Sequence, residues 1–307
     1  MRILVLGAGV IGCVYAGKLD QVGHEVVLLA RGRRLSDLQT DGLVLLEAIT
    51  GERLVLRLPT MSEASSERFD LVMVPVRSEQ LASTLPVLAA MTDRGSDVLF
   101  FGNTAGRQGE FTAILGDRVL FGFPAVGGVR DGSIIKYVLI NQQKTMLGES
   151  NGEMTPRIKR LQQVFDGAGF STKVSADIDG WLLAHAAFIV PIALSLYSVG
   201  IDAARLAADP VALRLMVLAT RQGFMALRSG GNTEIPANLH VLYGLPTAFV
   251  VAYWRRVFAS PRGELWFAAH ARAAPEEMSS LAKELKAALP RSGRSWPDLD
   301  RLLAAAW

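Results

Sequence analysis

The N-terminal half of the chain alternates short apolar runs with segments of helical spacing. Apolar runs long enough for one buried strand occur at residues 1–6, 24–29, 69–74, 97–101, 118–122 and 144–148. Apolar residues three or four positions apart follow some of these runs, as at 13–19 and 78–91. Strands that alternate with helices are typical of a doubly wound, mostly parallel sheet. Two more runs, 43–47 and 53–58, flank a turn and predict a hairpin inserted in that sheet.

The pattern changes near Asp177, after which strand signals disappear. Four segments separated by Gly, Pro and Asn predict helices at 181–197, 210–229, 237–258 and 261–289, and Pro191 is expected to kink or break the first. Lys173 and Val174 are expected to close the sheet. We therefore predict an α/β chain with a Rossmann-type domain over residues 1–175. An all-helical domain for substrate binding or dimerisation is predicted over 176–307.

The first apolar run leads into a G-x-G-x-x-G sequence, Gly7-Ala8-Gly9-Val10-Ile11-Gly12. A helix and a second strand follow within about 30 residues, which is the context that a dinucleotide-binding site requires. Gly7 allows a tight turn, Gly9 lets the backbone approach a pyrophosphate, and Gly12 lets the helix pack on the strand. The free N–H groups at the helix start, around Val10 and Ile11, would face the phosphates. The alternative is a glycine turn that binds nothing.

The residues after the second strand bear on the choice of cofactor. An NAD site has Asp or Glu there to accept hydrogen bonds from the ribose 2′-hydroxyl. This chain reads Ala30-Arg31-Gly32-Arg33-Arg34, and Glu25 lies at the opposite end of the strand. Guanidinium groups bind phosphate with bidentate, charge-assisted bonds, so the sequence favours NADP(H). The alternative is a solvated basic loop.

Composition excludes several classes of protein. Half of the 307 residues are hydrophobic and a fifth are charged, as in a well-buried globular chain of two domains. The net charge is +3, with seven lysines and no basic run interleaved with aromatics, so no nucleic-acid partner is expected. A single cysteine, Cys13, excludes internal disulfides. The four histidines and Cys13 lack ligand spacing, so no metal is expected.

Two apolar stretches bear on membrane association. Residues 186–199 are too few to span a bilayer, and 239–254 include His240, Pro246 and two tyrosines. The apolar start has glycines where a signal peptide needs a helix. We expect a soluble, cytoplasmic protein without membrane contact. The many apolar helices are compatible with a homodimer.

Arg77 and Asn103 follow two of the predicted parallel strands, at the rim where such sheets bind ligands. Arg77 could hold a cofactor phosphate. Asn103 could hydrogen-bond the nicotinamide ribose or a substrate oxygen. Either could instead be an ordinary loop residue.

These motifs together resemble the ketopantoate reductases (2-dehydropantoate 2-reductases) over about the first 150 residues. The resemblance implies NADPH-dependent reduction of a carbonyl compound. It implies that Arg31 contacts the 2′-phosphate, that Arg77 stands where the family has a cofactor-binding lysine, and that Asn103 lies beside the nicotinamide and substrate. The motifs concerned are Gly7–Gly12, Ala30-Arg31-Gly32, Val76-Arg77, Gly102-Asn103, Gly122-Phe123-Pro124-Ala125-Val126, Arg130-Asp131-Gly132 and Leu147-Gly148-Glu149.

The second half departs from that family where its catalytic residues are expected. The family's first long helix there carries a catalytic lysine and, four residues later, an asparagine. Anchored on Pro191, these positions are Leu182 and Ala186; anchored on Trp181, they are Leu183 and Ala187. No lysine occurs from residue 174 to 282. The family's late Ser and Glu have approximate counterparts in Ser260 and Glu264.

Hydride delivery to a carbonyl needs a proton donor, and His185 is the candidate on that helix. It lies three residues after Leu182, on nearly the same face, and histidine ordinarily titrates near neutrality. The alternative is a core histidine. Arg272 could bind a substrate carboxylate, or could be a surface residue.

We therefore expect an NADPH-dependent reductase of a small, 2-oxo acid-like carbonyl compound, with an altered catalytic helix. An imine-type substrate is a related alternative. A non-catalytic NADP(H)-binding or sensing protein is the rival from another class.

Overall fold

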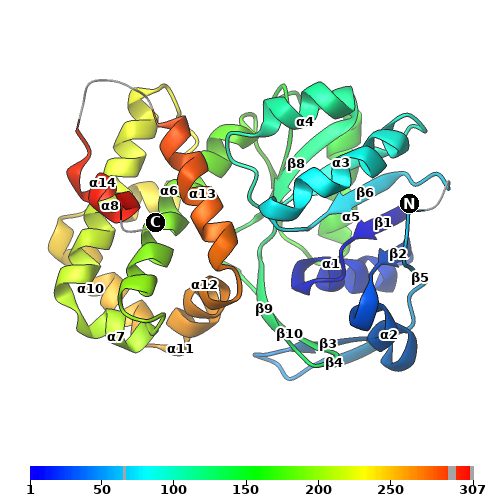
Figure 1. Cartoon of the computed structure of the whole chain (residues 1–307), viewed down its shortest axis with the longest axis horizontal. Coiled ribbons are helices and arrows are strands. Elements are labelled where there is room, and N and C mark those ends of the chain that lie inside the picture. The colour runs from blue at the N-terminus through cyan, green and yellow to red at the C-terminus, as the bar shows by residue number, and fades with distance from the viewer. Residues whose placement is uncertain (65–66, 290–294, 305–307) are drawn as a thin grey trace. The chain divides into compact units, whose positions relative to one another are not determined.

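The chain divides into two compact units, Met1–Ile178 and Asp179–Trp307. The structure, a computed structural model, describes residues 1–64, 67–289 and 295–304 (Figure 1).

An eight-stranded sheet forms the base of the first unit, with the order β12-β11-β8-β7-β6-β1-β2-β5. The strands from β5 through β8 run parallel, whereas β11 is antiparallel to β8 and parallel to β12. This sheet confirms the expected Rossmann-type class. Its strands are β1 (Arg2–Leu6), β2 (Glu25–Leu29), β5 (Thr60–Met61), β6 (Leu71–Val74), β7 (Asp97–Phe101), β8 (Val119–Phe123), β11 (Thr145–Glu149) and β12 (Thr172–Val174).

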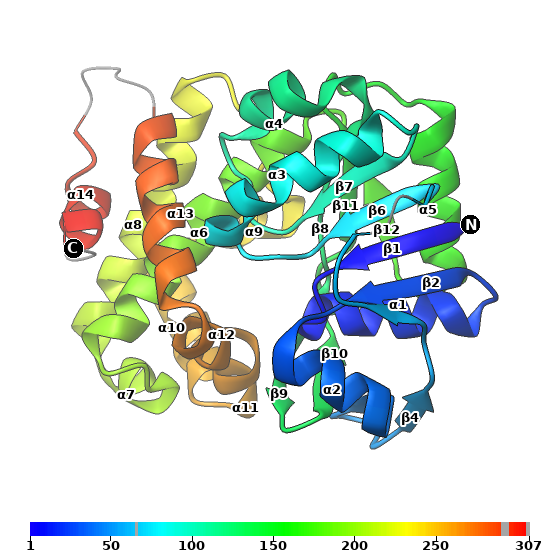
Figure 2. The same ribbon diagram turned by 45° about the vertical axis from the view of Figure 1, so that its right-hand side comes forward.

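Neighbouring aromatic residues on β7 show how helices cover the two faces. Successive strand residues point to opposite faces. Phe100 stacks on Phe111 with centroids 4.3 Å apart, whereas Phe101 meets the edge of Tyr15 at 4.7 Å. Helices α3 and α4 therefore cover one face, and α1 and α5 cover the other (Figures 1 and 2). The helices of this unit are α1 (Val10–Gln21), α2 (Gly32–Asp41), α3 (Ser78–Thr92), α4 (Gln108–Leu115), the 3₁₀ turn η1 (Gly116–Arg118) and α5 (Pro156–Gly167).

The expected hairpin forms, but its placement in the main sheet was wrong. Strands β3 (Leu43–Glu47) and β4 (Arg53–Leu56) belong to a second sheet of order β4-β3-β10-β9. Strands β9 (Val126–Asp131) and β10 (Ile134–Leu139), which the sequence analysis missed, complete it.

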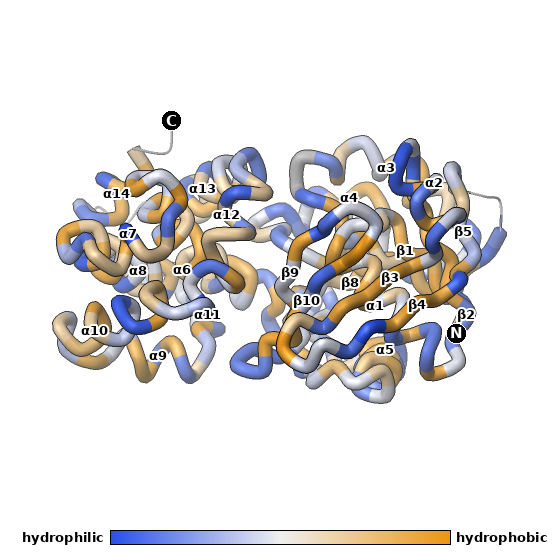
Figure 3. Tube along the Cα trace, turned by 90° about the horizontal axis from the view of Figure 1, so that it is seen from below, coloured by the Kyte–Doolittle hydropathy of each residue, from blue (hydrophilic) through white to orange (hydrophobic). Residues whose placement is uncertain are grey.

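The second sheet packs on α1, which explains why that helix is apolar on nearly all sides (Figure 3). A Cβ added to Gly17 would lie 2.7 Å from Leu45 Cδ1. The helix is thus enclosed between two sheets, and the apolar side chains of β3 are buried against it rather than in the main sheet.

All secondary-structure elements among the described residues of the second unit are helices. Strands are absent there, as expected. Its helices are α6 (Ile178–Ser198), α7 (Ala203–Ala208), α8 (Pro210–Ser229), α9 (Ala237–Gly244), α10 (Thr247–Phe258), α11 (Pro261–Gly263), the π-helical segment η2 (Glu264–Ala268), α12 (Ala269–Ala273), α13 (Pro275–Ala288) and α14 (Pro297–Ala304).

Two expectations for these helices were wrong. The helix expected at 237–258 is split between α9 and α10 at Pro246, which caps α10. The helix expected at 261–289 is interrupted before α13, which starts with Pro275. Proline lacks the N–H that would continue a preceding helix. By contrast, α6 runs through Pro191 without a break.

Helix α6 is also longer than the apolar stretch 186–199 suggested. Its 21 residues are long and apolar enough to cross a membrane, so the argument from shortness does not hold. However, 83% of its most apolar window is buried inside the structure, as in a core helix.

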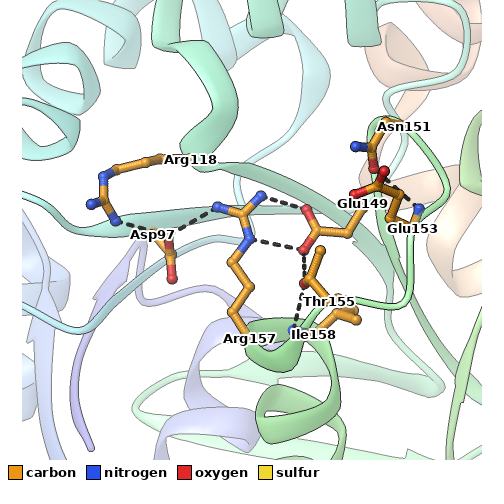
Figure 4. Close-up of polar contacts among 8 residues, drawn as sticks. All are labelled: Asp97, Arg118, Glu149, Asn151, Glu153, Thr155, Arg157 and Ile158. Carbon is orange, nitrogen blue, oxygen red and sulfur yellow. Dashed lines mark hydrogen bonds and ion pairs between the residues drawn. The ribbon is translucent and has the colours of Figure 1, made fainter.

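A partly buried ion cluster joins α5 to the main sheet (Figure 4). Glu149, whose side chain is 2% exposed, accepts hydrogen bonds from both Thr155 Oγ1 and Arg157. Arg157 Nη1 also lies 3.1 Å from Asp97 Oδ1, and Arg118 Nη1 lies 3.3 Å from the same oxygen. Because Asp97 begins β7, this cluster is at the edge of the sheet opposite the carboxyl ends of the parallel strands.

Candidate cofactor site and candidate catalytic residues

The glycine turn between β1 and α1 has the backbone that each glycine was expected to permit. Gly7 has a φ of 124°, which L side chains rarely adopt. A Cβ on Gly12 would lie 2.1 Å from the Gly7 carbonyl oxygen, so only glycine allows this close packing. A Cβ on Gly9 would meet nothing within 4 Å. The space in front of Gly9 is therefore open, as close approach of a ligand to the backbone requires.

The start of α1 presents unpaired N–H groups beside this open space. Gly9 is the N-cap residue, no side chain caps the helix, and its first turn holds no acid. The first N–H groups of a helix lack intrahelical acceptors and carry a partial positive charge. The turn around Val10 and Ile11 can therefore bind a phosphate group.

The basic loop after β2 divides into accessible and buried arginines. Arg31 is exposed, caps α2 and makes one long bond, Nε to the Ser62 carbonyl at 3.4 Å. The Arg33 side chain is 92% exposed. Glu25 pairs with Arg2 at 2.7 Å at the far end of β2, as expected from its position. Helix α2 also has no acid in its first turn.

Arg34 does not fit the sequence-based view that all three arginines are available to a 2′-phosphate. Only 7% of the Arg34 surface is exposed. Its Nε donates to the Ala8 carbonyl at 3.2 Å, and Nη1 donates to the Ser133 carbonyl at 3.1 Å. Nη2 lies 3.2 Å from Cys13 Sγ. The guanidinium is engaged behind the glycine turn because the Arg34 side chain extends from α2 to Ala8 and Cys13.

Arg77 and Asn103 lie at the same edge of the sheet as the glycine turn. They follow β6 and β7, which are adjacent parallel strands next to β1. Arg77 is exposed and caps α3, whereas Asn103 is 9% exposed. Val76, the residue before Arg77, packs against the glycine turn, because its Cγ1 would lie 2.9 Å from a Cβ on Gly7. The two side chains thus remain candidates for binding one cofactor with this turn.

The β9–β10 hairpin also borders the glycine turn, and the sequence analysis missed its role. A Cβ on Gly128 of β9 would lie 3.0 Å from Val10 Cγ1. The mostly apolar run Ile134–Leu139 after the Gly132 turn was the available signal.

His185 lies on α6 in an aromatic environment. Its ring stacks on Trp181, with centroids 5.5 Å apart and planes 9° apart, and meets Phe188 edge-on. Burial, with a smaller contribution from the nearby His270, lowers the pKa of His185 to about 3. The expectation that His185 titrates near neutrality is therefore wrong for this structure. At neutral pH the side chain is a neutral imidazole, which can still donate its N–H.

The lysine and asparagine positions of α6 carry apolar residues in either register. Leu182, Ala186 and Ala187 are buried, and Leu183 is half-buried. None of these side chains can transfer a proton.

The three predicted substrate residues of the second unit make local contacts. Ser260 Oγ caps α11 through the Arg262 N–H and donates to the Val257 carbonyl. Arg272 Nη1 lies 2.8 Å from Glu264 Oε1, and Nη2 donates to the Ile201 carbonyl at 3.1 Å. Glu264 begins the π-helical segment η2, a feature that often marks functional sites. Substrate binding by these residues stays a prediction.

Within residues 1–64, 67–289 and 295–304, no three His, Cys, Asp or Glu side chains gather as metal ligands.

Comparison with known proteins identifies relatives of this chain. The family model described as ketopantoate reductase PanE/ApbA matches residues 3–152. A 2-dehydropantoate 2-reductase of Pyrococcus horikoshii is 28% identical over 184 residues, which cover 59% of this chain and 58% of that protein. The chain spans about three fifths of the length of the curated relatives it matches. The resemblance inferred from the motifs is confirmed over the N-terminal half.

Solved structures with a similar fold extend over both units. The 2-dehydropantoate 2-reductase of Geobacter metallireducens GS-15 has a TM-score of 0.80 at 16% identity, covering 100% of this chain and 99% of that chain. D-mandelate dehydrogenase with NADH and anilino(oxo)acetate has a TM-score of 0.73 at 16% identity, covering 100% and 97%. At this identity the likeness shows the fold alone.

Proposed function

We propose that this chain, whose residues 3–152 belong with the ketopantoate reductases, is an NADP(H)-dependent oxidoreductase that reduces a small carbonyl compound resembling a 2-oxo acid. The observation that carries the proposal is the open space in front of Gly9, at the uncapped start of α1. A phosphate fits such a place because the N–H groups and the helix dipole both attract negative charge. The proposed cofactor supplies a hydride when it is bound.

In this proposal the first unit holds the cofactor. Gly7, Gly9 and Gly12 shape the turn, and the N–H groups near Val10 and Ile11 bind the diphosphate. Arg31 binds the 2′-phosphate, supported by its exposure and by the absence of an acid in the first turn of α2. Arg77 binds a phosphate, and Asn103 orients the nicotinamide or a substrate oxygen.

The second unit supplies a hydrogen-bond donor for the alkoxide and the substrate contacts. His185 donates a hydrogen bond from its neutral imidazole N–H to the developing alkoxide, in place of the lysine that α6 lacks, and water supplies the proton. Arg272 binds the substrate carboxylate, and Ser260 and Glu264 contact other polar groups of the substrate. Because Glu264 now occupies Arg272, a substrate carboxylate would have to displace it.

A non-catalytic NADP(H)-binding or sensing protein is the second candidate function. The apolar side chains at 182, 183, 186 and 187 and the neutral His185 favour it, because carbonyl reduction needs a proton donor. An imine-type substrate is an alternative within the enzyme class. We further propose a soluble, cytoplasmic protein that binds no nucleic acid and can form a homodimer.

The two candidates are separated by cofactor binding and turnover on the same protein. We expect NADPH to bind more tightly than NADH in calorimetric titrations. We also expect NADPH oxidation with at least one member of a panel of 2-oxo acids, ketones and imines that includes ketopantoate. Tight binding without oxidation would favour the sensing protein. Failure to bind either dinucleotide would contradict both.

A further inference from the structure

Arg34 is a buried cation without an acidic partner. All three of its recorded contacts are to neutral acceptors: the Ala8 carbonyl, the Ser133 carbonyl and Cys13 Sγ. No carboxylate oxygen lies within 4.0 Å of its guanidinium in the described part of the chain. Burying an uncompensated charge is costly, so such groups are normally paired. This position therefore lacks a negative charge that a ligand could supply.

The bond from Arg34 to Ala8 acts on the peptide that precedes Gly9. A trans peptide is planar, and its C=O and N–H point in opposite directions. The structure contains no cis peptide bond among the described residues. With the Ala8 carbonyl directed at Arg34, the Gly9 N–H is directed away from it. A charged donor on the carbonyl also polarises the peptide and strengthens its N–H as a donor.

The second bond ties the same guanidinium to the β9–β10 hairpin. Ser133 lies in the turn between β9 and β10, where its carbonyl meets Arg34 of α2. Gly128 of the hairpin packs against Val10, at the start of α1. The planar fork of Arg34 thus bonds both the glycine turn and its neighbouring hairpin through two different nitrogens.

We propose that Arg34 is a positioning residue for the dinucleotide's diphosphate: it orients the Ala8–Gly9 peptide from behind, and the diphosphate supplies the missing negative charge. The proposal rests on the proposed cofactor function. It differs from the role of Arg31, because the diphosphate is common to NADH and NADPH whereas the 2′-phosphate is not. Loss of Arg34 therefore weakens both cofactors alike.

Calorimetric titration of Arg34→Gln with NADH and with NADPH tests this role. The variant keeps a side-chain amide but loses the charge, and circular dichroism confirms that it is folded. We expect affinity for both cofactors to fall about ten- to a hundredfold, the range of a charge-assisted hydrogen bond. Arg34→Lys should recover part of the loss, because it restores the charge without the fork.

Arg57→Gln is the matched control. Arg57 Nη1 donates to the Gln39 and Thr40 carbonyls at 3.1 Å each, so it also bonds backbone of α2, but at the opposite end of the helix. We expect this variant to bind both cofactors like the unmodified protein.

The outcomes separate this inference from the proposed function. A folded Arg34→Gln variant with unchanged affinities, or with a loss confined to NADPH, overturns the inference. Should Arg34→Gln not fold, Arg34→Lys serves as the test instead. A loss of affinity for both cofactors in Arg34→Lys would support the inference, and unchanged affinity for both would overturn it. If the unmodified protein binds neither cofactor, the proposed function itself fails.

Discussion

His185 and Trp181 stack on one face of α6, with their ring planes 9° apart and their centroids 5.5 Å apart. This packing keeps the imidazole out of water, and the pKa of His185 falls to about 3. A core histidine and a neutral hydrogen-bond donor are both compatible with that environment. Measurements of stability and turnover distinguish a purely structural His185 from one that hydrogen-bonds the substrate.

The first prediction concerns the pH dependence of stability. The folded-state pKa of His185 is lower than the ordinary unfolded value of about 6.5, so the unfolded chain binds the proton first. Stability should therefore fall as pH drops from about 6.5 toward 3. Between pH 7 and pH 5 this single group should cost ~2 kcal/mol.

Denaturation followed by tryptophan fluorescence measures this effect in the second unit alone, because all five tryptophans lie at position 181 or beyond. His185→Gln should remove the extra loss of stability, whereas His240→Gln should retain it. An equal pH dependence in the unmodified protein and His185→Gln would contradict the assignment.

The second prediction concerns His185 in turnover. If its N–H meets the developing negative charge, His185→Ala should lower turnover about a hundred- to ten-thousandfold while NADPH affinity is unchanged. Since the pKa is about 3, the rate profile of the unmodified enzyme should show no histidine limb near neutrality. Steady-state kinetics from about pH 5 to about pH 9 measure the turnover of the variant and the pH profile of the unmodified enzyme. This range includes the ordinary histidine pKa. Full turnover in the variant would make His185 a core residue.

The third prediction separates the two functions of the glycine turn. Gly9 has a φ of −76° and open space around its missing Cβ, so Gly9→Val should fold with nearly unchanged stability. The added side chain occupies the diphosphate position, so cofactor binding should be lost. Gly12→Ala is the contrasting variant: its Cβ would lie 2.1 Å from a carbonyl oxygen, which should cost about 1–3 kcal/mol. Chemical denaturation and cofactor titration together test the pair. Normal NADPH binding by Gly9→Val would mean that the turn is only structural.

The fourth prediction concerns cofactor preference. Arg31→Ala should weaken NADPH binding about ten- to a hundredfold and leave NADH binding nearly unchanged, since only the 2′-phosphate contact is lost. Titration of both cofactors on the same preparation provides the internal control. Equal affinity of the unmodified protein for NADH and NADPH would rule out the NADP(H) assignment.

The fifth prediction concerns the ion cluster at the other edge of the sheet. Arg157→Met should destabilise the first unit by about 3–5 kcal/mol, because Glu149 is 2% exposed and would lose its partner. The Arg118 side chain is 48% exposed, so Arg118→Met should cost less than about 1 kcal/mol. Denaturation followed by circular dichroism compares the two. Similar losses would show that the burial of Glu149 does not decide the cost.

Local pattern was sufficient for the Rossmann-type core. The apolar strands, the glycine turn and the basic loop after β2 are each encoded by residues close in sequence, so periodicity and turn chemistry predicted them. The same reasoning placed Arg77 and Asn103 at the carboxyl ends of their strands, because parallel strands share that edge. It also predicted α8 and the absence of strands in the described part of the second unit.

Tertiary structure alone decided where distant segments meet. Local sequence did not show that the β3–β4 hairpin belongs to a second sheet, because its partner strand, β10, lies about ninety residues further on. Arg34 could not be distinguished from Arg31 and Arg33 by sequence, since its burial depends on α2 folding against Ala8, Cys13 and Ser133. The pKa of His185 likewise depends on aromatic rings and desolvation that no local pattern encodes. Local residue types determine an element, whereas the state of a polar side chain is determined by what packs around it.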